Sequence, residues 1–359
     1  LSALVLLGCT NAGLMAALWV LYLSVAHIGQ LFWSYGWESQ LLETGFLAIF
    51  FCPLTSLTPF PRRPAPLAVV FLYRWLAFRL FLGAGLIKLR GDPCWRALSC
   101  LDYHFETQPV PSPISPFFHF LPAWALKAGV VFNHVAELVL PWGFFGPRAA
   151  RLVCGLTAIA FQLTLILSGN LSFLNWLSLI PLIACLDDRL LQHVAPQRLT
   201  APLALAQRQP SHLAHRWVVG FLTALVCVLS LQVVDNLFFA RRQTMNRTYD
   251  PFALVNTYGA FGSVGRERDE LVVEGTDDGA TWRPYEITCK PGDPARRPCW
   301  MSPFHYRLAW QIWFAAMSTA DDEPWMIHFV WKLLHNAPAA LELVDSNPSP
   351  GTPPKQIRV

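Results

Sequence analysis

Ionisable side chains lie inside several long apolar stretches of this 359-residue sequence. Charged groups in such surroundings are costly to bury, so they are candidates for a functional site. The candidates are Glu43, Arg74, Arg79, Lys88, His134 and Glu137, together with the amides Asn170 and Asn175. In the structural alternative, the arginines pair with Glu43 or Glu137 between helices and Lys88 extends to the membrane surface. The sequence favours this alternative because ion pairs inside membrane bundles are common.

His134 and Glu137 are three residues apart and so share one face of a predicted helix. A histidine and a carboxylate in this arrangement could relay protons or supply half of a metal site. A metal site needs further ligands, and His104 and His119 lie in a loop rather than on a matching helix. We therefore predict a hydrogen bond within the helix, and neither a metal nor another cofactor.

Seven apolar segments could cross a membrane, since a spanning helix needs roughly 17–25 mostly apolar residues. They are residues 3–32, 41–57, 67–87, 129–145, 152–168, 171–186 and 217–239. Residues 152–186 contain no charged side chain, and as one helix they would be about 52 Å long, so we place a break at Gly169 and Asn170. The sequence predicts an all-α helical membrane bundle for residues 1–240 and a soluble α+β domain, containing β-strands, for residues 241–359.

The predicted C-terminal domain begins with strands and continues with a helix. Residues 271–275 and 282–289 are strand-like and flank Asp277-Asp278-Gly279, which is typical of a hairpin turn. Further on, apolar side chains recur on one face of a helix, at Trp310, Trp313, Phe314 and Met317. We expect this face to form the core of the domain, with a membrane-surface or partner-binding face as the alternative.

Arginine positions predict the orientation in the membrane. The second, fourth and sixth connections contain eight arginines and the first and fifth contain none, which places the even connections in the cytoplasm. The long third connection, residues 89–128, and everything after Ala240 then face the lumen or the exterior, where disulfides persist. Two cysteine pairs occur there, Cys94 with Cys100 and Cys289 with Cys299. We predict a disulfide for the second pair, and for the first either a disulfide or two free thiols on a helical turn.

Several function classes are disfavoured. The net charge of +4 is too small and too scattered for binding to nucleic acid. The sequence contains no hydrolase elbow, phosphate loop, dinucleotide fingerprint or kinase signature. We therefore expect neither a nucleic-acid-binding protein nor an enzyme.

Motifs along the whole chain resemble the lipase maturation factor family. They lie, in family order, at residues 35–46, 74–79, 83–92, 103–109, 168–176, 255–263, 289–294 and 305–316. They are more similar to the first vertebrate paralogue than to the second. Relative to the family, we expect that a region before Leu1 with its first membrane segment, and a region after Val359, are missing.

The resemblance implies a multi-pass membrane protein with a chaperone-like role, in which it helps secreted lipases or other secreted proteins fold and assemble into active homodimers. Its location would be the endoplasmic reticulum membrane, or the cytoplasmic membrane in a bacterium. The client would then be bound on the lumenal side by the third connection, through Tyr103, His104, Glu106 and Gln108. In the alternative, His104 and Glu106 fold back and cap the helix bundle.

Two other classes remain as alternatives. Residues 83–89 are faintly similar to a membrane segment of vitamin-K-dependent carboxylases, which implies an integral membrane enzyme with Lys88 as the base. A small-molecule transporter is the second alternative, and the lack of inverted repeats counts against it.

Overall fold

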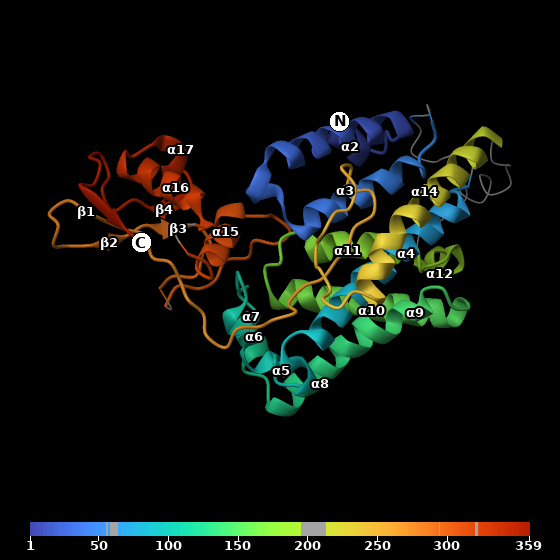
Figure 1. The fold of residues 1–359 in the computed structure, drawn as a ribbon, viewed down its shortest axis with the longest axis horizontal. Helices are drawn as coiled ribbons and strands as arrows, with labels where there is room; N and C mark the ends of the chain where they lie inside the picture. The colour runs from blue at the N-terminus through green and yellow to red at the C-terminus, as the bar shows by residue number, and fades with distance from the viewer. Residues whose placement is uncertain (55–56, 58–63, 195–212, 294, 320–321) are drawn as a thin grey trace. The chain divides into compact units, whose positions relative to one another are not determined.

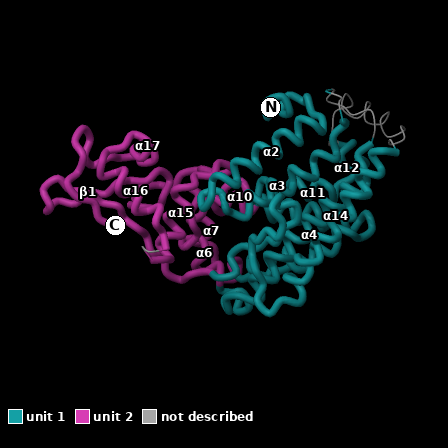
Figure 2. The backbone as a smooth tube through the Cα atoms, turned by 45° about the horizontal axis from the view of Figure 1, so that its top comes forward, with its two compact units in different colours: residues 1–99, 127–163, 174–263 teal, residues 100–126, 164–173, 264–359 magenta. Residues whose placement is uncertain are grey.

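The computed structural model describes residues 1–54, 57, 64–194, 213–293, 295–319 and 322–359. The chain divides into two compact units (Figure 2). Unit 1 comprises Leu1–Ser99, Lys127–Leu163 and Leu174–Ser263, and unit 2 comprises Cys100–Leu126, Thr164–Phe173 and Val264–Val359. Residues 241–263 group with the helices of unit 1, and the domain boundary predicted after Ala240 stays a prediction.

Four helices in the described part of the chain are long and apolar enough to cross a membrane. They are α4 (Leu67–Arg90), the continuous run of α8 (Ala123–His134), η2 (Val135–Val139) and α9 (Leu140–Gly143), then α10 (Arg148–Ser168) and α14 (Leu213–Phe238) (Figure 1). Each follows a long apolar run, which forms a helix in lipid because a helix satisfies its own backbone hydrogen bonds. Four of the predicted segments overlap these helices.

The expected total of seven spans is not confirmed. The first predicted segment is divided among α1 (Ser2–Leu6), α2 (Ala12–Ile28) and η1 (Gln30–Trp33), because Asn11 caps α2 by accepting a hydrogen bond from the backbone N–H of Leu14. The second is α3 (Gly36–Ile49), which has only 14 residues and buries three charged or amide side chains. The sixth is α11 (Leu174–Ile183), which has 10 residues and contains a proline.

The break expected at Gly169 and Asn170 is confirmed, since α10 ends at Ser168 and α11 begins at Leu174. Arg148 forms an ion pair of 2.5 Å with Asp187, next to α12 (Asp188–Val194), so the fourth and sixth connections meet at one end of these helices. The other arginines used to orient the chain include four that lie outside the described residues: Arg62, Arg63, Arg198 and Arg208.

Helix α4 is the centre of unit 1. The protein buries 67% of its most apolar stretch, compared with 28–33% for the three other long helices. It packs against α3, η2, α9, α11 and α14. Because the protein covers most of α4, this helix can accommodate the buried cations Arg74, Arg79 and Lys88.

Unit 2 contains two small antiparallel sheets. One has the strand order β2-β1-β5, with β1 at Glu274–Thr276, β2 at Arg283–Pro284 and β5 at Gln356–Arg358. The other pairs β3 (Glu286–Ile287) with β4 (Val344–Ser346). The predicted hairpin is therefore present between β1 and β2, with Gly275 opposite Arg283.

Asp278 stabilises the turn of this hairpin. Its Oδ1 atom accepts hydrogen bonds from the backbone N–H groups of Thr281 (2.7 Å) and Ala280 (2.8 Å). These donors favour the ionised carboxylate, so they lower the pKa of Asp278 well below its ordinary value. The Asp-Asp-Gly turn predicted from the sequence thus has a specific chemical basis.

The helices of unit 2 are α6 (Leu101–Thr107), α7 (Ser115–His119), α15 (Arg307–Ala315), α16 (Pro324–Leu334) and α17 (Pro338–Leu341). Helix α15 was expected, but its predicted core face is wrong in part. The core is formed by Leu308, Ile312 and Ala315, which pack with α16 and the strands. Phe314 is 39% and Met317 is 60% exposed. Trp310 is buried as predicted, but the aromatic spacing did not identify the rest of the buried side because smaller residues occupy it.

Candidate functional site

An extended buried polar network lies beside the middle of α4 and contains Arg79 and Glu43. These two side chains form an ion pair in which each is only 1% exposed. Arg79 Nη1 also donates a hydrogen bond of 2.7 Å to the backbone carbonyl of Asn256. The structural interpretation predicted from the sequence therefore describes Arg79 correctly, and Asn256 is an additional partner.

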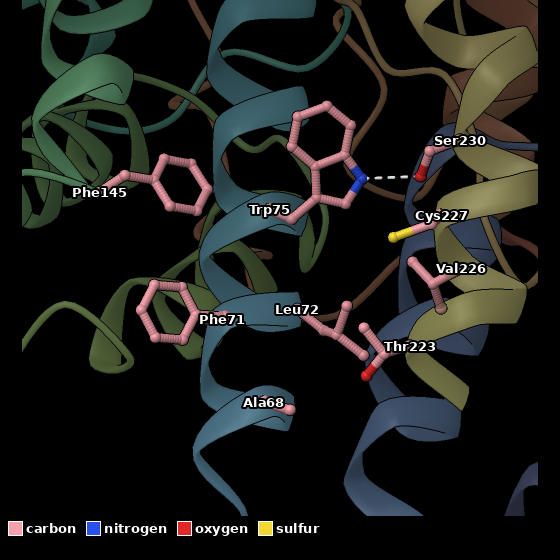
Figure 3. Close-up of a pocket in the computed structure, with 9 residues that line it drawn as sticks. All are labelled: Ala68, Phe71, Leu72, Trp75, Phe145, Thr223, Val226, Cys227 and Ser230. Carbon is pink, nitrogen blue, oxygen red and sulfur yellow. Dashed lines mark hydrogen bonds between the residues drawn. The ribbon is translucent and has the colours of Figure 1, made fainter. Parts of the chain in front are cut away.

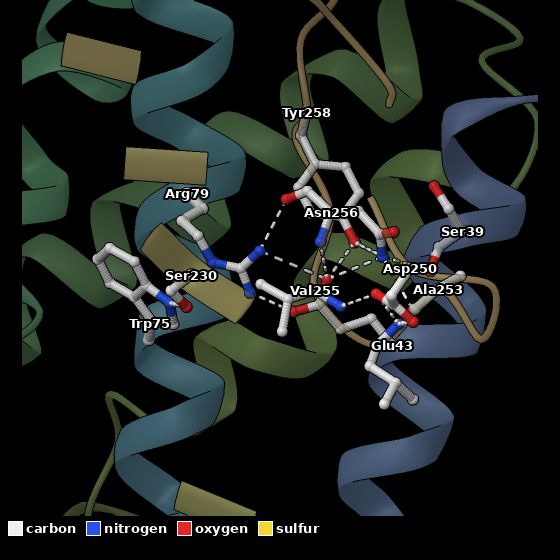
Figure 4. Close-up of polar contacts among 11 residues, drawn as sticks. Ser39, Glu43, Trp75, Arg79, Ser230, Asp250, Ala253, Val255, Asn256 and Tyr258 are labelled. Carbon is white, nitrogen blue, oxygen red and sulfur yellow. Dashed lines mark hydrogen bonds and ion pairs between the residues drawn. The ribbon is translucent and has the colours of Figure 1, made fainter. Parts of the chain in front are cut away.

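Glu43 accepts hydrogen bonds from several donors at once (Figure 4). Its Oε2 atom accepts from Tyr258 Oη at 2.7 Å, and from both the backbone N–H and the side-chain Nδ2 of Asn256 at 3.1 Å. Burial raises the pKa of Tyr258 well above its ordinary value, and the nearby Glu43 carboxylate adds to this rise, so the phenol stays protonated and donates. These donors hold both oxygens of the Glu43 carboxylate within the network, so it is not free to act as a base or a nucleophile.

These contacts hold an irregular chain segment inside the helical unit. We call residues 253–262 the inserted segment; its residues 253–259 are all buried. Non-helical backbone among membrane helices requires partners in the protein, because lipid offers none. The partners include the backbone N–H of Asp92, which donates to the carbonyl of Gly262 at 2.8 Å, and Trp95 Nε1, which donates to the carbonyl of Phe261 at 2.8 Å.

Two glycines, Gly83 within α4 and Gly91 directly after its last residue, make room for the inserted segment. A Cβ atom on Gly83 would lie 2.4 Å from the carbonyl oxygen of Tyr258, and one on Gly91 would lie 2.2 Å from that of Gly262. Contacts this short with backbone atoms cannot be relieved by moving a side chain. Glycine is therefore required at both positions for the segment to pass along α4.

Lys88 is at the centre of a second buried network in unit 1. Its Nζ atom lies 2.5 Å from Glu137 Oε1 and 3.0 Å from Asn133 Oδ1, and 5.0 Å from the centre of the Trp95 ring. Lys88 is 4% exposed, so the expectation that it extends to the membrane surface is wrong. Its ammonium group gains more from a carboxylate, an amide and an aromatic face within the protein.

The π-helical turn η2 places Glu137 opposite Lys88. Asn133 Nδ2 donates to Glu137 Oε2 at 2.9 Å, whereas His134 Nε2 contacts the carbonyl of Trp95 at 3.0 Å. The predicted hydrogen bond between His134 and Glu137 is thus replaced by one from Asn133. Turns of this kind are rare and occur frequently at functional sites, because they redirect side chains.

Arg74 and Asn175 have separate roles in unit 1. Arg74 Nε donates to the carbonyl of Ala184 at 2.8 Å and its guanidinium lies 4.9 Å from the centre of the Phe71 ring, so it binds a carbonyl near the end of α11 rather than a glutamate. Asn175 Nδ2 donates to Gln162 Oε1 at 2.7 Å. Both residues join helices, and neither belongs to the two networks above.

In unit 2, the third connection is held by internal hydrogen bonds. Gln108 is 3% exposed, and its Nε2 atom donates to Ser115 Oγ (2.9 Å) and to the carbonyl of Ser168 (3.1 Å). Arg268 donates to the carbonyls of three consecutive residues, with Nη2 2.9 Å from that of Pro109. Gln108 therefore shapes the connection from inside and does not present its amide to a partner.

Asn170 connects two other parts of unit 2. Its Nδ2 atom donates to the carbonyls of Pro111 (3.0 Å) and Cys299 (2.9 Å), and its Oδ1 atom accepts from the backbone N–H groups of Met301 (3.0 Å) and Ser302 (3.1 Å). All hydrogen-bonding positions of this amide are used. Asn170 is thus a structural residue.

The remaining residues of the third connection differ in exposure. The side chain of Glu106 is 55% exposed and lies 3.6 Å from His119 Nε2. Tyr103 is half-buried under the guanidinium of Arg266, 5.7 Å from the ring centre, and His104 is buried. Of the four residues predicted to bind a client, Glu106 and the outer part of Tyr103 are accessible.

Cys289 and Cys299 form a disulfide, with their Cα atoms 5.6 Å apart. Cys94 and Cys100 are each disulfide-bonded, so the predicted alternative of free thiols is wrong. In the part of the chain that the structure describes, no group of three or more His, Cys, Asp or Glu side chains could hold a metal ion.

The comparisons with known proteins cover nearly the whole chain. Residues 1–193 match the family described as the lipase maturation factor transmembrane domain, and residues 254–359 match the lipase maturation factor C-terminal domain. The chain belongs to the lipase maturation factor family.

Individual family members are similar along their common length. Lipase maturation factor 1 of Bos taurus is 48% identical over 98% of this chain and 66% of its own length, and that of Homo sapiens is 45% identical over 98% and 65%. Lipase maturation factor 2 of Homo sapiens is 30% identical over 100% of the chain and 66% of its own length. The chain thus spans slightly less than two thirds of these relatives. No solved structure gives a significant match.

The inserted segment has a particular place within the lipase maturation factor family. The C-terminal domain match begins at residue 254, whereas the structure groups residues up to Ser263 with unit 1. The first ten residues of the C-terminal match therefore belong to the helical unit. Sequence reasoning missed Asn256 and Tyr258 because asparagine and tyrosine in a connecting segment give no signal of burial. The apolar character of residues 253–255 was the available hint. Asn133 lies within the predicted segment 129–145, so its amide in apolar surroundings was a signal that the sequence did offer.

Proposed function

We propose that this chain is a membrane-bound maturation factor that helps secreted lipases fold and assemble, rather than an enzyme that acts on them. Membership in the lipase maturation factor family, over both of its matched domains, carries this proposal. The buried networks support it, because Glu43 and Glu137 are each bound by a cation and by amide donors. Such groups stabilise a fold, and these two carboxylates are not free to act as an acid, a base or a nucleophile.

The carboxylase alternative has no support in these contacts. A lysine that serves as a base needs an unshared lone pair close to the substrate. Lys88 Nζ is instead bound by a carboxylate and an amide oxygen and lies against an indole ring. The Lys88 network is better explained as a structural contact that holds α4 against the η2 turn.

The proposed location is the endoplasmic reticulum membrane, with the third connection and the C-terminal residues in the lumen. The disulfide at Cys289 and Cys299 supports an oxidising side for this part of the chain. A lumenal client would meet the accessible residues of the third connection, Tyr103 and Glu106. His104 and Gln108, which are buried, would act by holding that surface in shape.

Co-expression with a lipase tests the proposal. A cell line without its own maturation factor would receive a secreted lipase together with this chain. The expected result is a higher lipase activity per amount of secreted lipase, with a larger dimer fraction on sedimentation. Unchanged specific activity at a normal level of correctly localised protein would reject the maturation role.

Variants of the third connection separate client contact from stability. Glu106→Ala changes an exposed side chain, and Asp102→Ala, on the same short helix and also exposed, is its matched control. If Glu106 contacts the client, only its variant lowers lipase activity while both proteins accumulate normally. Gln108→Ala should lower the amount of the protein itself, because it removes buried hydrogen bonds.

A further inference from the structure

A groove of about 500 Å³ lies between α4 and α14 in unit 1 (Figure 3). Leu72 and Trp75 line it from α4, and Thr223, Val226 and Cys227 line it from α14. It is open at the side: Cys227 is exposed and Phe71, at its edge, is 43% exposed. The groove adjoins the Glu43 network, because the Arg79 guanidinium lies 5.5 Å from the centre of the Trp75 ring, but none of its lining residues takes part in the Glu43 or Lys88 ion pairs.

The lining favours an apolar occupant. Trp75 Nε1 donates to Ser230 Oγ at 2.8 Å, and Thr223 Oγ1 donates to the carbonyl of Val219 at 2.8 Å. These polar groups are thus already engaged within the protein, and the rest of the lining is mostly aliphatic and aromatic carbon. An occupant would gain its binding free energy from apolar contact rather than from hydrogen bonds.

Both walls of the groove are helices that can cross a membrane. A groove that opens sideways between two such helices faces the hydrocarbon of the bilayer, in which acyl chains are the abundant apolar groups. This position favours a membrane lipid over a soluble ligand.

Arg216 provides a group that could bind the head of such a lipid. It is exposed and lies in the first turn of α14, which begins at Leu213. Positions 216, 223 and 230 are seven residues apart, so they share one face of the helix with a drift of only about 20° per interval. Arg216 therefore lies about 10 Å along α14 from Thr223, on the face that lines the groove. A guanidinium at the end of a membrane helix is well suited to bind a phosphate through two hydrogen bonds.

We propose that the groove between α4 and α14 binds one acyl chain of a membrane phospholipid whose phosphate contacts Arg216. The occupant is a glycerophospholipid of the leaflet that contains the N-terminal end of α14. By the arginine distribution this is the cytoplasmic leaflet, where anionic phospholipids are abundant.

Photo-crosslinking tests the site with the full chain in phosphatidylcholine nanodiscs. The probe is phosphatidylserine with a diazirine in its acyl chain, and labelled peptides are mapped by mass spectrometry. We expect labelling of α4 and α14 at the groove that excess unlabelled phosphatidylserine suppresses. Labelling that excess phosphatidylserine does not suppress would mean ordinary contact with bulk lipid and would overturn the proposal.

Matched variants define the two parts of the site. Cys227→Trp fills the groove and should reduce labelling about tenfold. Val228→Trp is the matched control and should leave labelling unchanged, because Val228 is 64% exposed on the same helix and does not line the groove. If Cys227→Trp does not elute as a folded protein, Ala68→Phe fills the groove from the opposite wall. Equal labelling of the occluded and wild-type proteins would reject the groove as the site.

The head-group contact has its own test. Arg216→Gln should raise the concentration of phosphatidylserine needed for competition about tenfold, as expected for the loss of one charge-assisted contact. Palmitic acid should compete poorly with phosphatidylserine. Equal competition by the free fatty acid, or an unchanged Arg216→Gln variant, would overturn the assignment of a phospholipid.

Discussion

Replacing Glu43 with glutamine removes one charge from the network beside α4 and leaves the other in place. Arg79, 1% exposed, would then be a buried cation without a counter-ion, and Tyr258 and Asn256 would donate to a neutral amide. Loss of one partner from a buried ion pair costs roughly 3–5 kcal/mol. In a folding unit of roughly 150–250 residues, such as unit 1, each kcal/mol lowers the melting temperature by about 2–4 °C, so Glu43→Gln should lower it by about 6–20 °C.

The assay is the fraction of detergent-solubilised protein that remains monodisperse after heating, measured by size-exclusion chromatography. The double variant Glu43→Gln, Arg79→Met removes both charges and should recover part of the loss, because the unpaired cation is gone. Asp277→Asn is the control, since it breaks an exposed ion pair with Arg283 that contributes about 1 kcal/mol or less. A Glu43→Gln protein that melts within about 2 °C of the wild type would refute the reasoning.

Three further predictions concern other parts of the fold. Gly83→Ala should lower the melting temperature by several degrees, because overpacking costs about 1–3 kcal/mol. Gly220→Ala is the control and should not lower it, because no atom lies within 4 Å of the added Cβ. Equal melting temperatures for the two variants would contradict the close passage of the inserted segment along α4. Because the folded pKa of Asp278 is lowered, its ionised form stabilises the hairpin above the unfolded pKa near 3.8, and this contribution is lost as the pH falls through the folded pKa. The destabilisation caused by Asp278→Ala should therefore be largest at neutral pH and shrink in acid, as followed by circular dichroism at several pH values. Changing Cys289 and Cys299 to serine together should lower the free energy of unfolding by about 2–4 kcal/mol. The measurement is limited proteolysis, in which the C-terminal part of the variant should be cleaved earlier. Unaltered proteolysis would show that this disulfide does not stabilise the fold.

Long apolar runs and local turn chemistry were sufficient to predict much of the fold. They predicted α4, α10 and α14, the break after Ser168, the hairpin around Asp278 and the helix at Arg307–Ala315. They did not predict that α3 is short. Its apolar residues are interrupted by Glu38, Gln40 and Glu43, whose burial depends on partners from distant helices and loops.

The partners of the buried charges could not be predicted from the sequence in the same way. Arg79 and Asn256 are 177 positions apart, and Lys88 and Asn133 are 45 apart. Local periodicity carries no information about such pairs, because they are set by how the helices pack. The rare π-helical turn that directs Glu137 toward Lys88 also has no simple sequence signal. The composition of the third connection suggested that Gln108 and His104 belong to a recognition surface. In the structure both side chains are buried inside the connection.

The inserted segment has a consequence for the order in which the protein is made. Residues 253–262 are synthesised after α14, the last of the four long apolar helices in the described residues, yet they supply the backbone and side chains that complete the surroundings of Glu43 and Arg79. Until the ribosome has passed this point, the bundle contains a carboxylate and a guanidinium whose remaining hydrogen bonds are unmade. A nascent chain that stops between Ala240 and Asn256 would therefore present an unfinished membrane core to the quality-control machinery, although the four long apolar helices of the described chain had been inserted.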